Sequence, residues 1–507
     1  MPICQVNALK SKSSIHALAR TSYRRILRLA AIALILAIPA LGFTQIIVSN
    51  PDELTSSLGK AQPDDEIVVR NGSYNDWIFD ISRSGTSSAP ILIRAEVPGK
   101  VILSGKSRIE IKGDHVTIRG FWFKNGEADD AIWYMSGSHS RITDCALTDY
   151  KDDRCKWIRL KYGKNNRLDH NYISGKTKRD VTLQIDVSNS EKLNHHRIDH
   201  NYFGPRAKGW GNGWETIRNG YSHQQNYPAY NLFEHNLFHQ CDGEIEIISS
   251  KSSHNTYRYN TFRDCAGELT LRHGKYNLVD GNFFFGQGKK GSAGIRIIGE
   301  GHRVVNNYID KTSLAGIHIY EGDDDAQPTG YQPTNDVLIA FNTIVNSKSS
   351  GIQVREYGRI PRNIIIANNL FVGNASAVAG LSASQLSKGY SFHGNIAYSN
   401  EVPVATPQSA FKSLDPKLVR DSHGVLRPAE GSPVIGAATS DYENFGFQVK
   451  ADLDGQRRPE SKDVGADQVN ATGEIINRPL DTSDIGKSIG PSWMKKGMAA
   501  TDYLPHE

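Results

Sequence analysis

The chain has 507 residues, of which 38% are hydrophobic, 9% aromatic and 22% charged, and its mean hydropathy is −0.46. Such a chain can bury a sizeable core, which excludes an intrinsically disordered protein and a multi-span membrane protein. Six Lys and Arg residues and no Asp or Glu lie in the first 45 residues, so the remaining 53 basic and 54 acidic residues leave a net charge of −1. This balance excludes a globally basic nucleic-acid binder.

The N-terminal segment has the layout of a secretory signal. A basic stretch that ends at Arg28 leads into an apolar run from Leu29 to Phe43. About 20 apolar residues are needed to span a bilayer, so this run favours a signal over a retained membrane anchor. We predict a signal peptide over residues 1–42, cleavage after Gly42, and a secreted or periplasmic protein with no stable membrane span.

A short motif recurs through the middle of the chain: two or three residues of strand character, an Asn, and then an aromatic or aliphatic residue. Successive copies are 22 to 35 residues apart. The Asn residues of these copies are Asn171, Asn201, Asn236, Asn260, Asn282, Asn307, Asn342, Asn369 and Asn395.

This repeat predicts an all-β fold, a right-handed parallel β-helix over residues 43–400. Each coil would supply about three short strands, with insertions as loops on one face. We expect the Asn residues to adopt the left-handed conformation at the bends and to stack as a hydrogen-bonded ladder. Residues 401–470 are predicted to pack along the helix as an extension, and residues 471–507 to form a loose, irregular tail.

Two neighbouring coils can be aligned through Cys241 and Cys265, with an offset of 24 residues. Strand alternation then places four aliphatic residues in the core, Ile245, Ile247, Leu269 and Leu271. It places polar residues on the outer face, in adjacent rungs: Glu244, Glu246, Glu268, Thr270, Arg272, Arg296, His318 and Tyr320. We interpret this face as a site.

The residue types on this face suit an acidic polysaccharide. Glu244 and Glu246 can converge on a hard cation such as Ca²⁺, whose preferred ligands are oxygens. Lys251, Arg272 and His273 add a basic lining that would meet the carboxylate of a uronate.

Three alternatives remain open. The face could be an ordinary solvated surface with cross-strand ion pairs, or Glu244 and Glu246 could be the acid pair of a β-helical glycoside hydrolase. A carbohydrate-binding solenoid is the third alternative. Trp157, Arg159 and Lys161 alternate on a strand and could extend the groove.

Four ordered motifs resemble the central motifs of polysaccharide lyase family six, which contains alginate lyases and chondroitinase B. They begin at Asn212, Glu244, Leu269 and Gly294 and read NGWETIR, EIEIISSKS, LTLRHG and GIRIIG. The resemblance implies Lys251 as general base, Arg272 as general acid, and calcium bound by Asn212, Glu215, Glu244 and Glu246. It also implies substrate contacts from His273, Arg296, Tyr320 and Arg218.

The implied reaction is calcium-assisted β-elimination of a 4-O-linked uronate polymer to unsaturated oligosaccharides. The outer face beyond the core has Arg296, His318, Tyr320 and Arg355 but no dense Lys/Arg cluster suited to sulfate. We therefore expect alginate as the substrate, with mannuronate-rich blocks preferred, and keep dermatan sulfate as the alternative. The oligomeric state is open.

Overall fold

The computed structural model describes residues 45–498, except 153, 188–192, 324–326, 328, 356–359, 402–409 and 444–445. The predicted signal peptide, residues 1–42, lies outside the described residues. Within the described ranges, no helix is both long enough and apolar enough to cross a membrane.

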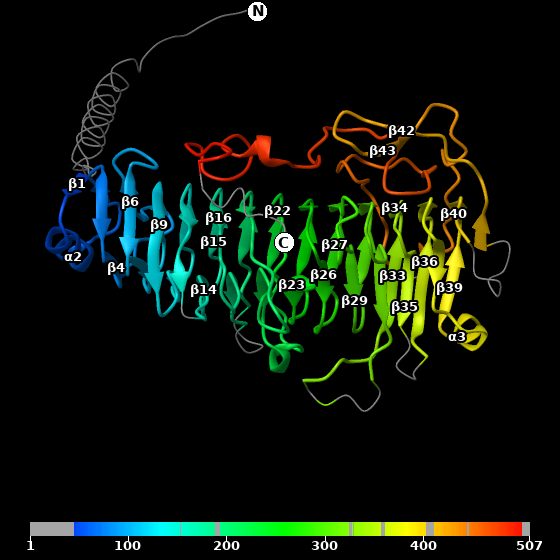
Figure 1. Cartoon of the computed structure of the whole chain (residues 1–507), viewed down its shortest axis with the longest axis horizontal. Coiled ribbons are helices and arrows are strands. Elements are labelled where there is room, and N and C mark those ends of the chain that lie inside the picture. Colours follow the sequence, from blue (N-terminus) through cyan, green and yellow to red (C-terminus); the bar gives the residue numbers. More distant parts are fainter. Residues whose placement is uncertain are drawn as a thin grey trace, which may run out of the picture. The chain divides into compact units, whose positions relative to one another are not determined.

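The chain winds into a parallel β-helix whose coils contribute strands to three long sheets (Figure 1). Sheet A has 14 strands: β1 (Gln45–Val48), β2 (Glu66–Val69), β5 (Ile91–Ala95), β8 (Val116–Arg119), β11 (Arg141–Thr143), β15 (Arg167–Asp169), β18 (Arg197–Asp199), β21 (Leu232–Glu234), β24 (Thr256–Arg258), β27 (Leu278–Asp280), β30 (Arg303–Val305), β33 (Asn335–Ala340), β36 (Arg362–Ala367) and β39 (Tyr390–His393).

Sheet B has 15 strands: β3 (Gly72–Asn75), β6 (Val101–Gly105), β9 (Phe121–Ala128), β12 (Ala146–Thr148), β13 (Lys151–Asp152), β16 (Tyr172–Ser174), β19 (Tyr202–Phe203), β22 (Leu237–His239), β25 (Thr261–Arg263), β28 (Phe283–Phe285), β31 (Tyr308–Asp310), β34 (Thr343–Val345), β37 (Leu370–Val372), β40 (Asn395–Tyr398) and β41 (Phe411–Lys412).

Sheet C, which carries the predicted site, has 12 strands: β4 (Ile78–Ile81), β7 (Arg108–Ile111), β10 (Trp133–Met135), β14 (Ile158–Leu160), β17 (Leu183–Ile185), β20 (Ile217–Asn219), β23 (Glu246–Ser250), β26 (Glu268–Leu271), β29 (Ile295–Ile297), β32 (Ile317–Tyr320), β35 (Ser350–Arg355) and β38 (Ser376–Ala379). The remaining elements are the antiparallel pair β42 (Leu418–Arg420) and β43 (Leu426–Pro428), helices α2 (Pro51–Lys60) and α3 (Ala383–Lys388), and 3-10 turns η1 (Ser222–Gln224) and η4 (Thr482–Asp484).

Inward-facing residues of the three sheets form one continuous apolar core. Helix α2 closes its N-terminal end, because Leu54 and Leu58 are buried against that core. Asn50 caps this helix by accepting a hydrogen bond from the backbone N–H of Glu53. A capped end of this kind covers the apolar coil that a solenoid otherwise exposes.

The recurring Asn residues form a ladder of side-chain hydrogen bonds. In each step the Nδ2 group donates to the Oδ1 atom of the next Asn, as from Asn171 to Asn201 (3.1 Å) and from Asn369 to Asn395 (3.0 Å). The prediction that the Asn residues themselves adopt the left-handed backbone conformation is wrong by one residue. The left-handed conformation falls on the residue before the ladder Asn, for example on His170 (φ 51°). The bend at this position turns the Asn side chain inward, where it is buried.

The predicted pairing of β23 with β26 is also wrong. Glu246 lies opposite Glu268, and a bulge at Ile247 shifts the register before Ile248 pairs with Leu269. Both Ile247 and Ile248 are in the core, whereas Ile245 is 40% exposed. A bulge adds one unpaired residue to one strand, so strict alternation cannot be carried across it.

The C-terminal segment is irregular but not loose. Leu480, Ile485, Ile489 and Met494 pack on outward-facing apolar residues of sheet B, including Tyr172. Figure 1 shows this segment in red, running along the coils. The expectation of a loose tail is therefore wrong for the residues described up to 498.

Candidate active site

The outer face of sheet C presents one row of polar side chains across successive coils. Strand pairing aligns these positions from β14 to β35: Arg159, Gln184, Arg218, Ser249, Thr270, Arg296, His318 and Gln353. Neighbouring parallel strands are about 4.8 Å apart. This row is therefore a continuous polar track along the helix.

Lys251 and Arg272 occupy equivalent positions on adjacent coils. Each is the first residue after its strand, and the preceding residues, Ser250 and Leu271, are paired. The backbone N–H groups of Lys251 and Arg272 donate to the carbonyl groups of Asn219 (2.8 Å) and Ser250 (3.0 Å). The fold thus brings together two cations that the sequence separates by 21 positions.

The Lys251 side chain is only 11% exposed. Burial lowers the pKa of Lys251. The Glu215 carboxylate, 3.9 Å from Nζ, opposes this shift, and the positive charges of Arg272 and Arg218 reinforce it. A lowered pKa increases the fraction of neutral amine near pH 7, which is the form that can accept a proton.

Glu215, which is buried, and Glu244, which is half-buried, are neighbouring carboxylates with opposite pKa shifts. Arg218 holds both oxygens of Glu215 (2.9 and 2.8 Å) and lowers its pKa against the effect of burial. Burial and the negative charge of Glu215 raise the pKa of Glu244. The Oε1 atom of Glu244 accepts hydrogen bonds from the backbone N–H groups of Gly213 (3.1 Å) and Trp214 (3.0 Å).

Glu246 connects this carboxylate group to the arginines of the track. Its Oε1 atom accepts a hydrogen bond from Nη1 of Arg272 (2.9 Å) and lies 3.7 Å from Nη1 of Arg296. Although burial opposes the shift, Glu246 raises the pKa of Arg272. Arg272 therefore remains protonated near pH 7.

Glu268 faces outward, as predicted, but it is fully buried rather than solvated. It forms an ion pair with Arg296, and its Oε2 atom lies 2.7 Å from Nδ1 of His318. Burial raises the pKa of a carboxyl group, but His318 and Arg296 hold the pKa of Glu268 below its ordinary value. Such complete enclosure excludes an ordinary solvated face at this position.

Tyr331 is a site residue that the sequence reasoning missed. Its ring contacts the Arg272 guanidinium (5.6 Å to the ring centroid) and the His273 ring (5.7 Å between centroids). Burial, together with the charges of Arg272 and Lys251, lowers the pKa of His273 to about 3, so this imidazole is neutral at pH 7. Tyr331 lies between strands β32 and β33, outside any repeat, and no periodic signal identifies it.

The other predicted residues have mixed outcomes. Asn212 is exposed, and its backbone carbonyl accepts a hydrogen bond from Arg179. Tyr320 stacks under both Arg296 (5.0 Å) and Arg355 (5.7 Å). Trp157 does not extend the groove because it is fully buried in the core.

The oxygen donors here suit a hard cation. The Oε2 atom of Glu246 is buried and has no hydrogen-bond partner among the described residues. Burial raises the pKa of Glu244 most, and the negative charges of Glu215 and Glu246 raise it further, so several carboxylates gather at this position. In the described part of the chain, however, His, Cys, Asp and Glu form no group of three or more already arranged around a metal position. The chemistry therefore fits calcium, although a closed ligand cage is not preformed.

Comparison with protein families matches residues 48–432 to the model described as Chondroitinase B. A search of curated proteins gives no significant match. Among solved structures, the chain is similar to the alginate lyase AlyGC of polysaccharide lyase family six, at 28% identity and a TM-score of 0.70. That match covers 87% of this chain and 60% of AlyGC, so this chain spans about 60% of that relative's length.

Two shorter enzymes of family six match over most of their own length. A mannuronic-acid-specific lyase from the human gut microbiota is 32% identical, with a TM-score of 0.66 over 73% of this chain and 91% of that one. A lyase from Pseudopedobacter saltans is 26% identical, with a TM-score of 0.61 over 73% and 98%. The chain therefore belongs to polysaccharide lyase family six, the family of chondroitinase B.

Proposed function

We propose that the protein is an alginate lyase that cleaves 4-O-linked uronate chains by β-elimination. One observation carries the proposal: Lys251 and Arg272 lie on adjacent coils, largely buried, beside the carboxylates of Glu215, Glu244 and Glu246. A base of lowered pKa next to a permanent cation is the arrangement that proton abstraction beside a carboxylate requires.

In the proposed reaction, neutral Lys251 removes the C5 proton of the uronate. The electrons of the C5–H bond form the C4=C5 double bond, and the C4–O4 bond breaks with its electron pair leaving on O4. Burial and the charges of Arg272 and Arg218 favour the neutral amine that this step needs. Lys251 carries the abstracted proton as an ammonium group.

Arg272 stabilises negative charge in this scheme and does not release its own proton. Glu246 raises its already high pKa, so deprotonation is unfavourable. Its guanidinium can instead donate hydrogen bonds to the developing charge on the uronate carboxylate or on O4. Water, or the protonated Lys251, then supplies the proton that completes the O4 hydroxyl.

Calcium is part of the proposal, with Asn212, Glu215, Glu244 and Glu246 as the residues that would hold it. When bound, the ion would neutralise charge on the uronate carboxylate and so acidify the C5 proton. The buried, unpartnered Oε2 atom of Glu246 supports this assignment.

Alginate is proposed because the charges of the track are largely compensated. Arg159, Arg218 and Arg296 each pair with a carboxylate of the protein. Such arginines offer directional hydrogen bonds to uronate carboxylates but little of the excess positive charge that repeated sulfates would need. The mannuronic-acid-specific relative supports a preference for mannuronate.

The test is a side-by-side assay of polymannuronate, polyguluronate and dermatan sulfate. We expect the ultraviolet absorbance of the C4=C5 product to rise fastest with polymannuronate. Preferential cleavage of dermatan sulfate would overturn the alginate assignment and favour an activity like that of chondroitinase B. Saturated products would identify a hydrolase with Glu244 and Glu246 as its acid pair. Export by the predicted signal would be tested by locating the mature protein outside the cell membrane.

A further inference from the structure

A cavity of about 370 Å³ lies outside sheet C, between the outer face of sheet A and the C-terminal segment. Its size is near the lower end of the range for small-molecule sites. It shares no residue with the proposed active site, and it is lined by Leu92, Thr117, Arg119, Arg141, Thr143, Asp144, His170, Lys487, Gly490 and Ser492.

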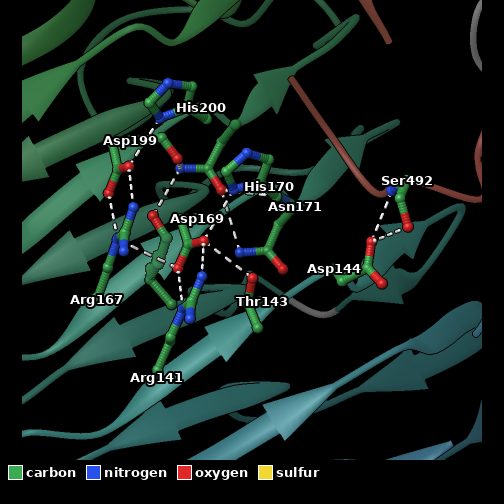
Figure 2. Close-up of polar contacts among 12 residues, drawn as sticks. Arg141, Thr143, Asp144, Arg167, Asp169, His170, Asn171, Asp199, His200 and Ser492 are labelled. Atoms are coloured by element: carbon green, nitrogen blue, oxygen red, sulfur yellow. Dashed lines mark hydrogen bonds and ion pairs between the residues drawn. The ribbon is translucent and has the colours of Figure 1, made fainter. Parts of the chain in front are cut away.

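Arg141 is held rigidly at the cavity wall. Its Nε and Nη2 atoms donate to the two oxygens of Asp169, at 2.6 and 2.5 Å (Figure 2). Asp169 is fully buried and also accepts from Thr143 (3.0 Å), with Nδ1 of His170 at 2.9 Å. The Nη1 atom of Arg141 has no hydrogen-bond partner among the described residues, which leaves one guanidinium nitrogen for a ligand.

The Asp144 carboxylate at the cavity accepts hydrogen bonds at Oδ1 and forms an ion pair at Oδ2, which has no hydrogen-bond partner among the described residues. Figure 2 shows Ser492 of the C-terminal segment beside Asp144. The Oδ1 atom of Asp144 accepts hydrogen bonds from the backbone N–H (2.6 Å) and the hydroxyl (3.0 Å) of Ser492. The Oδ2 atom lies 3.6 Å from Nε of Arg119, whose side chain is 53% exposed. Asp144 therefore anchors the C-terminal segment and leaves most of the Arg119 guanidinium accessible.

The C-terminal segment adds a third cation. Lys487 is exposed and forms no ion pair with any residue in the described ranges. Its turn is fixed, because Ile485 and Ile489 are buried and the N–H of Gly490 donates to the carbonyl of His200 (2.9 Å). Three cations and two engaged carboxylates, Asp144 and the buried Asp169, thus converge from two distant parts of the sequence, which leaves a net positive charge at the cavity.

We propose that this cavity is a second, non-catalytic site that binds the carboxylate of a uronate oligosaccharide. Arg119, Arg141 and Lys487 supply charge-assisted donors for the carboxylate. The hydroxyl of Thr117 lies among them and suits a sugar hydroxyl, whereas the hydroxyl of Thr143 donates to Asp169. The oxyanion chemistry follows from the cavity alone, whereas the choice of a uronate rests on the proposed function.

The test uses full-length protein carrying Lys251→Ala, so that ligand is bound without being cleaved. Calorimetric titration with a short saturated oligomannuronate is expected to show two sites per chain. Adding Arg119→Ala and Lys487→Ala should weaken one of them about tenfold or more. Lys495→Ala is the matched control, since Lys495 is an exposed lysine of the same segment outside the cavity, and it should keep both sites.

A single site, or a second site that the double substitution does not affect, would overturn the proposal. Titration with inorganic phosphate separates the two sources of an oxyanion: phosphate binding at the cavity without oligomannuronate binding would overturn the uronate assignment. Equal urea midpoints of the variants exclude misfolding as the cause of a lost site. Lyase activity of the unsubstituted protein is measured separately, so failure of the proposed function would be distinguished from failure of the second site.

Discussion

Replacing Glu268 by Gln should destabilise the protein strongly, although this residue lies on the outer face of a sheet. Glu268 is fully buried, and its partners Arg296 and His318 are 8% and 5% exposed. Removing one member of a buried ion pair typically costs about 3–5 kcal/mol. Arg296 would keep a weaker partner, Glu246 at 3.7 Å, so we expect a loss of about 3 kcal/mol.

The assay is urea unfolding followed by circular dichroism, with midpoints compared at equal slopes. Glu300→Gln is the matched control, because the Lys275–Glu300 pair is 36% and 31% exposed and exposed pairs contribute about 0–1 kcal/mol. The reasoning would be refuted if Glu268→Gln shifted the midpoint no more than Glu300→Gln does. We also expect a fall in kcat/KM, because Arg296 and His318 would lose the carboxylate of Glu268, which holds both side chains in place on the polar track.

Three further predictions concern the proposed active site. Lys251→Ala and Arg272→Ala should each lower turnover by several orders of magnitude while oligosaccharide binding persists. The control Lys275→Ala should leave turnover nearly unchanged. Near-normal turnover of Lys251→Ala would point to another base. A calcium chelator should abolish turnover and leave the circular dichroism spectrum nearly unchanged, with recovery on adding calcium, and full activity without metal would contradict the ligand assignment. Tyr331→Ala should reduce kcat/KM about tenfold, because the cation–π contact with Arg272 is lost. Tyr331→Phe keeps the ring and should retain most of the activity. An equal loss of kcat/KM in the two variants would instead assign the role to the hydroxyl group.

The fold could be predicted from the sequence because its determinants are local and repeated. Each Asn of the ladder recurs with a strand on either side, and stacking identical side chains requires only that coils follow one another. The same reasoning identified the coils that carry Lys251 and Arg272. Parallel pairing places those coils next to each other, but the offset of 24 residues taken from the sequence would align Lys251 with Lys275. The offset of 21 residues after the bulge at Ile247 brings Lys251 and Arg272 to equivalent positions.

The details of the site depended on tertiary structure. The bulge at Ile247 exposed Ile245 and placed Glu246 opposite Glu268, and no sequence spacing signals one inserted residue. Tyr331 reaches Arg272 from a loop that belongs to no repeat.

Burial and long-range packing were likewise decided only by the folded chain. Outward alternation predicted that Glu268 faces away from the core, but its enclosure by Arg296 and His318 depends on strands up to 50 residues away. The C-terminal segment packs because sheet B presents apolar residues such as Tyr172 on its outer face. The sequence by itself therefore determined the repeat and the chemical types of the site residues. The tertiary structure decided which charges are desolvated and paired, because these properties depend on neighbours that are distant in sequence.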